Sequence, residues 1–221
     1  MPTSTESTLD RRLYKICMVI ARLGLAYLFL TQLFWKLPPT FGCTGDFAFP
    51  QPAAENYWTG NGSGGLCYWM GLESIYAPQY RQVLVTDMRP AGGPKIGLNI
   101  TPIAQANALL IDNVLIPNIR FFGWVIWLAE AWVFLSMLLG VFSRLGALVS
   151  IGVMGQLWVS LANIPRPYEW EWAYGAILLL SIMLLGVAAG RTWGVDAWLR
   201  PKLSGSAQAG NRLAKIALLM S

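Results

Sequence analysis

The stretch FFGWVIWLAEAWVFLSMLLG, Phe121 to Gly140, indicates a membrane-spanning helix, because its 20 residues carry a single charge, at Glu130. An α-helix rises about 1.5 Å per residue, so about 20 apolar residues cross the roughly 30 Å hydrocarbon core of a bilayer. Three further apolar runs have a similar length, 16–35, 145–164 and 170–189. The sequence therefore predicts an all-α membrane protein whose single membrane domain is a four-transmembrane-helix antiparallel bundle.

The composition excludes several functional classes. Only 12% of the residues are charged, about half the share typical of soluble proteins. The net charge is +5, but the basic residues surround the ends of the apolar runs instead of gathering on one face, so we expect no nucleic-acid partner. The chain has no histidine, three scattered cysteines and no glycine-rich nucleotide motif, which argues against haem, metal and flavin sites. Redox chemistry would therefore need quinone or a cofactor on another subunit.

The basic residues predict the orientation. They flank the first run, follow the second at Arg144 and recur in the tail 191–221, whereas the short loop before the fourth run has only Arg166. The positive-inside rule then places both termini in the cytoplasm. The long segment of about 38–118 faces outward, and we expect it to form an ordered cap, because a structureless loop of that length is uncommon.

The cap contains Cys43 and Cys67, which an oxidising compartment would allow to pair as a disulfide, with two free thiols as the alternative. Mixed polar and apolar residues over 101–116 predict a short helix at the outer interface. The segment 211–220 has the same character and predicts a second interfacial helix on the cytoplasmic side.

Two charges are expected near the middle of the membrane. Arg22 lies nine residues after Leu13, and Glu130 lies nine residues after Phe121 on a run entering from the opposite side. An Arg–carboxylate pair would satisfy both groups, and the amide of Gln156 falls at a similar depth. One hypothesis makes this cluster a structural lock between helices. The other makes Glu130 and Arg22 catalytic, in a proton relay or beside a quinone pocket.

Tryptophans near the outer face allow two interpretations. Trp127, Trp170 and Trp172 fit an interfacial aromatic belt, which is common in membrane proteins. They could also line a site for a flat quinone head, with Lys36 and Arg166 steering an anionic substrate from outside.

Several stretches resemble the DoxX/DoxD membrane family. The second apolar run with its Glu130 and the following Gly-hydrophobic-Phe-Ser-Arg turn resemble the family's second span, and further similarity covers 22–25, 36–37, 169–172, 189–191 and 194–196. The similarity extends over about residues 13–37 and 104–199. It includes Arg144, Arg191 and Asp196, to which we assign structural roles at the ends of spans.

The resemblance implies a function. DoxD-like proteins are the membrane subunit of thiosulfate:quinone oxidoreductase, so the expected activity is oxidation of thiosulfate with a non-covalently bound quinone as acceptor. It also implies a DoxA-like partner or a larger complex, in the inner membrane of a prokaryotic cell. The alternative is a non-catalytic accessory subunit of a respiratory or photosynthetic complex. A small transporter is disfavoured because the runs show no inverted repeat.

Overall fold

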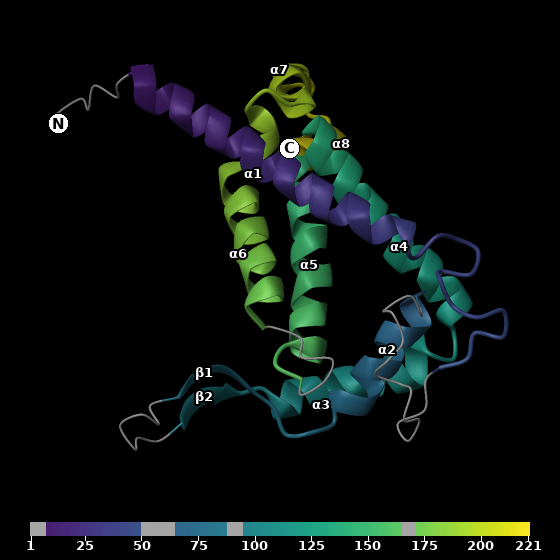
Figure 1. Ribbon diagram of the computed structural model, residues 1–221. Helices are drawn as coiled ribbons and strands as arrows, with labels where there is room; N and C mark the ends of the chain where they lie inside the picture. The colour runs from purple at the N-terminus through teal and green to yellow at the C-terminus, as the bar shows by residue number, and fades with distance from the viewer. Residues whose placement is uncertain (1–7, 50–64, 88–94, 165–170) are drawn as a thin grey trace. The chain divides into compact units, whose positions relative to one another are not determined.

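The computed structural model describes residues 8–49, 65–87, 95–164 and 171–221, and within them the chain is mostly helical (Figure 1). The α-helices are α1 (Thr8–Phe34), α2 (Gly65–Tyr76), α3 (Thr101–Leu110), α4 (Ile119–Leu139), α5 (Ser143–Leu161), α6 (Glu171–Val187), α7 (Val195–Gln208) and α8 (Arg212–Met220). The strands β1 (Gln82–Asp87) and β2 (Lys95–Asn99), the π-helical turn η3 (Ile111–Leu115) and the 3-10 turn η4 (Ala189–Arg191) complete the described elements.

Three helices, α1, α4 and α5, are long and apolar enough to cross a membrane. They match the first three predicted spans, so the prediction of transmembrane helices is confirmed for these segments. The helix at the fourth predicted span, α6, is apolar but has only 17 residues. At about 1.5 Å per residue such a helix is at the lower limit for crossing the hydrocarbon core.

The chain divides into two compact units. Unit 1 comprises residues 1–31, 129–151 and 179–221, and unit 2 comprises residues 32–128 and 152–178. The helices α1, α4, α5 and α6 each contribute residues to both units.

Unit 1 contains a tight turn between α4 and α5. Gly140 has φ +64°, a left-handed conformation that glycine adopts without steric cost, and the N–H of Val141 donates to the carbonyl oxygen of Ser136 at 3.1 Å. Beyond the turn, a Cβ built on Gly146 would lie 2.3 Å from Ser136 Oγ, so glycine allows α5 to approach α4 closely.

Unit 2 has a compact core beside a disulfide. Cys43 and Cys67 are bonded, with their Cα atoms 5.4 Å apart, and the bond ties the start of α2 to the segment after α1. The buried residues around it are Phe41, Leu66, Met70 and Ile119. Gly42 and Gly65 are in backbone contact, because a Cβ on Gly42 would lie 2.7 Å from Gly65 Cα.

Unit 2 also contains an antiparallel sheet of β1 and β2 that was not predicted from the sequence. Gln82 pairs with Asn99, and the register shifts between Val83 and Thr86. Leu84, inside this irregularity, has φ +52°. The expected interfacial helix at 101–116 corresponds to α3 and η3, and the expected helix at 211–220 corresponds to α8. Helix α7 was not predicted.

Candidate functional site

A buried acid on α2 lies at the centre of a polar cluster in unit 2. Glu73 is only 3% exposed, and its Oε2 accepts a hydrogen bond from Gln156 Nε2 on α5. The same amide nitrogen donates to Ser160 Oγ at 3.0 Å, because residues four positions apart lie on one face of a helix. Asn107 on α3 also donates to Ser160 Oγ. Side chains from α2, α3 and α5 therefore form one connected polar cluster that includes this carboxylate.

Arg81 adds a buried cation to this cluster and is only 5% exposed. Its guanidinium donates to the carbonyl oxygens of Ser160 and Ala162. These carbonyls lie at the C-terminal end of α5, where they have no partner within the helix and where the helix dipole favours positive charge. Arg81 thus completes the end of α5 and also brings positive charge towards Glu73.

The surroundings change the protonation of both groups. Burial raises the pKa of Glu73 to about 7, against the opposing effects of hydrogen bonds from Ser160 and Gln156 and of the charges of Arg81 and Lys36. Burial also lowers the pKa of Arg81 to about 10, opposed by the charge of Glu73. At neutral pH the guanidinium therefore remains charged, while Glu73 is present in both its protonated and its ionised form.

Lys36 lies among aromatic side chains in the same unit. It is 5% exposed, and its Nζ is 4.5 Å from the centre of the Trp35 ring. The Trp35 and Trp69 rings are 6.4 Å apart, and Tyr68 meets Trp69 edge-on at 5.6 Å. Two predicted binding residues, Gln156 and Lys36, are therefore brought to the surroundings of Glu73, next to an aromatic surface.

The predicted catalytic residues lie in unit 1, and both are buried, Arg22 at 3% and Glu130 at 2% exposure. The guanidinium of Arg22 donates to the carbonyl oxygens of Thr192 at 3.2 Å, Trp193 at 3.4 Å and Ala189 at 3.5 Å. Arg22 therefore fastens α1 to the turn that follows α6. A direct pair between Arg22 and Glu130 stays a prediction.

Asp196 organises the turn between α4 and α5. Its side chain is fully buried and accepts from the N–H groups of Phe142 at 2.8 Å and Ser143 at 2.9 Å, and from Ser143 Oγ at 2.7 Å. A carboxylate is stabilised at the first residues of a helix by the unpaired N–H groups and by the helix dipole. The N–H of Asp196 in turn donates to the carbonyl oxygen of Gly140 at 2.8 Å, which closes the arrangement.

The remaining predicted residues are less clustered. Trp127 is half-buried beside the core around the disulfide, and Trp172 on α6 is 53% exposed. Arg166 and Trp170 lie outside the described residues. The predicted structural residue Arg191 lies in η4 and donates to the carbonyl oxygen of Ser221 at 3.0 Å. Arg144, also predicted to be structural, lies in the first turn of α5.

Glu73 and Arg81 were not predicted from the sequence. One signal for Glu73 was available, since it is the only charge in the apolar helix Gly65–Tyr76, just as Glu130 is the only charge in its run. The meeting with Gln156 could not be predicted, because 83 residues separate the two. Within the described part of the chain, no group of three His, Cys, Asp or Glu side chains could hold a metal ion.

No family model matches the chain, and no solved structure matches it either. The DoxX/DoxD resemblance therefore stays a prediction.

Proposed function

We propose that the chain is the integral-membrane subunit of a quinone-linked oxidoreductase, resembling the DoxD subunit that serves thiosulfate oxidation. The observation that carries the proposal is the buried Glu73, bound by Gln156 and accompanied by Arg81 and Lys36. Buried acids that titrate near neutral pH beside fixed cations are concentrated at functional sites.

The donor set fits a quinone and an anionic substrate. A bound quinone would supply the redox chemistry, accepting two electrons and two protons while two thiosulfate ions are joined as tetrathionate. Its carbonyl oxygens need donors and its ring needs a flat apolar surface, which Lys36 and the Trp35 and Trp69 rings provide. The charges of Arg81 and Lys36 would attract the thiosulfate dianion.

The residues of the cluster then have distinct roles. Glu73 holds and releases the proton, because its pKa lies close to the working pH. Gln156 orients the carboxylate through its amide, and Ser160 supports that amide at 3.0 Å. Glu130 in α4 is proposed as a second proton-exchanging acid, and Arg22 as the anchor of α1 on the carbonyls of 189–193.

Glu73→Gln and Glu130→Gln test the activity most directly. Membranes that contain the full protein with its native partners should reduce quinone with thiosulfate about a hundredfold more slowly when a required proton carrier is lost. Asp112→Asn is the control, since Asp112 is an exposed acid bonded to Ser74 at 2.6 Å near the same helix. Unaltered rates in both glutamine variants would refute the catalytic role.

The proposal includes four spans, with α6 as the fourth and both termini in the cytoplasm. The apolar character of α6 and the bases of the tail support this topology. A fluorescent reporter fused after Ser221 should be protected from protease added to intact cells. Digestion of the reporter would place the C-terminus outside the cell and refute this topology.

An accessory role in a larger membrane complex is the second candidate, because the cap exposes apolar side chains. Ile96 and Leu98 on β2 are 58% and 55% exposed, and Ile103 and Leu109 on α3 are 60% and 65% exposed. Such a surface is typical of a partner contact. A stable assembly purified in mild detergent, with no thiosulfate-dependent quinone reduction, would favour this alternative.

A further inference from the structure

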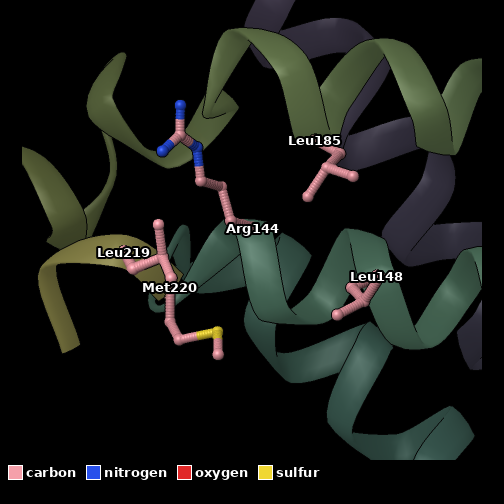
Figure 2. A pocket seen from close by; sticks show the side chains of 5 residues that line it. All are labelled: Arg144, Leu148, Leu185, Leu219 and Met220. Carbon is pink, nitrogen blue, oxygen red and sulfur yellow. The ribbon is translucent and has the colours of Figure 1, made fainter. Parts of the chain in front are cut away.

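Unit 1 contains a cavity of about 330 Å³ at the start of α5 (Figure 2). Arg144 and Leu148 line it from α5, Leu185 lines it from α6, and Leu219 and Met220 line it from α8. Four of these five side chains are apolar and one is a cation. A molecule that fits this lining needs an apolar part and an anionic group.

Arg144 is available to bind such a group. Among the described residues, its guanidinium donates no hydrogen bond, and its Nε is buried. The neighbouring arginines differ, because Arg191 donates to Ser221 O and Arg200 donates to the carbonyl oxygens of Leu218 and Ser221 at 3.1 and 3.0 Å. A guanidinium with several free donors is well suited to a phosphate.

Positive charge accumulates around this cavity. The pKa of Arg191 is lowered by burial first, and then by the positive charges of Arg200 and Arg144. Asp196 opposes these effects, but its carboxylate already accepts hydrogen bonds from Phe142 and Ser143. The positive charges of Arg200 and Arg144 thus act on Arg191 at this place, which favours an anion over a neutral molecule.

The helices beside the cavity have the character of a membrane-surface segment. On α8, Leu213, Ile216 and Leu219 are 76%, 55% and 64% exposed, and they share one side of the helix. On α7, Trp198 is 63% exposed, and Lys202 Nζ lies 3.4 Å from the centre of its ring. Exposed Trp and Leu next to basic side chains are typical of helices that lie at the lipid headgroups.

We propose that this cavity binds one anionic phospholipid, with its phosphate on Arg144 and the start of an acyl chain against Leu148, Leu185 and Met220. Arg191 and Arg200 strengthen the site by their charge. The apolar lining favours a lipid over free phosphate, and the excess of positive charge favours it over a neutral quinone. The site is separate from the cluster around Glu73 and does not depend on the proposed redox function.

Native mass spectrometry of the full-length protein in neutral detergent tests the proposal. Dioleoylphosphatidylglycerol and dioleoylphosphatidylcholine carry the same acyl chains, so the difference between them reports the headgroup. We expect the wild-type protein to retain the anionic lipid preferentially, and Arg144→Gln to weaken this retention about tenfold through loss of a charge-assisted contact.

Two further variants separate the cavity from general surface charge. Arg212→Gln removes an equal charge from the exposed start of α8 and should leave retention within about twofold. Leu148→Trp should reduce retention of the anionic lipid by filling the apolar side of the cavity. The melting temperature of each variant identifies any that fails to fold. Arg144→Gln should fold normally, because Arg144 donates no hydrogen bond among the described residues.

Four outcomes would overturn the proposal. Equal retention of the two lipids would show that the headgroup is not recognised. Equal losses in Arg144→Gln and Arg212→Gln would indicate nonspecific attraction to the basic surface. Competition by inorganic phosphate at the same concentration as the lipid would indicate a site for a soluble anion. Displacement of the lipid by a neutral quinone would assign the cavity to quinone.

Discussion

Gln156 on α5 donates a hydrogen bond to Glu73 on α2, across 83 positions of the sequence. Since Gln156 also donates to Ser160, its amide has a defined orientation, with the nitrogen towards the acid. The interaction links α5, one of the helices long and apolar enough to cross a membrane, to α2. Substitution of Glu73 therefore tests how this interaction contributes to the stability of unit 2.

Glu73→Gln should change how stability depends on pH. Because the pKa of Glu73 is raised from 4.5 to about 7 in the folded protein, its favourable contribution is complete below about pH 4.5 and is lost as the pH rises through about 7. A shift of this size corresponds to about 3 kcal/mol. As the pH is raised from about 4 to about 8, the melting temperature of the wild-type protein in detergent should therefore fall relative to that of the variant.

Glu171→Gln is the matched control for this measurement. Glu171 is also buried in unit 2, where its carboxylate accepts from the N–H of Leu84 at 3.0 Å. Because Glu171→Gln keeps Glu73, the fall in melting temperature attributed to Glu73 should remain in this variant. A wild-type-minus-variant difference that stays constant with pH would contradict the assignment to Glu73.

Gly140→Ala should destabilise the protein strongly. The new Cβ would lie 2.3 Å from Arg22 Nη1 and 2.8 Å from Gly194 Cα, in a left-handed conformation with φ +64°. The conformation alone costs about 1–2 kcal/mol for a residue other than glycine, and displacement of Arg22 adds to it. The loss should appear as a lower melting temperature in detergent.

Gly152→Ala provides the comparison within a helix. Nothing lies within 4 Å of a Cβ built on Gly152, so alanine meets no obstacle there. It should be neutral or stabilising by about 0.5–1 kcal/mol, because alanine loses less conformational freedom in a helix. Similar losses of stability in the two variants would contradict the special role assigned to Gly140.

Asp196→Ala should cost about 2–3 kcal/mol, because it leaves the buried N–H groups of Phe142 and Ser143 without their acceptor. Asp196→Asn should cost less, since one carbonyl oxygen can still accept. Hydrogen exchange at the first turn of α5 should increase in both variants, more so in alanine. An unchanged hydrogen-exchange rate would show that another group accepts hydrogen bonds from the N–H groups at the start of α5.

Reduction of the bond between Cys43 and Cys67 should destabilise unit 2. The bond closes a loop with a sequence separation of 24, which corresponds to about 3 kcal/mol in the chain-entropy model. The variant with both cysteines changed to serine should have the same melting temperature with and without reductant. A wild-type protein insensitive to reductant would contradict the prediction, provided that mass analysis shows free thiols.

The long helices could be predicted because their signal is local. A run of apolar residues reports a membrane-spanning helix without reference to the rest of the chain, and 121–140 differs from α4 by one or two residues at each end. The same reasoning predicted the helices near 101–116 and 211–220, because their mixture of polar and apolar residues is an equally local signal. It also identified Glu130 and Arg22 as buried charges.

The contacts that define the sites depend on residues far apart in the chain. Asp196 meets Ser143 across 53 positions, and Glu73 meets Gln156 across 83. The pairing of β1 with β2 likewise requires the two segments to approach each other, because β1 does not alternate and the alternation of β2 covers only five residues. Local composition therefore sufficed to identify helices and isolated charges, whereas the partner of each charge was determined by packing, because burial and hydrogen bonding arise only when distant segments meet.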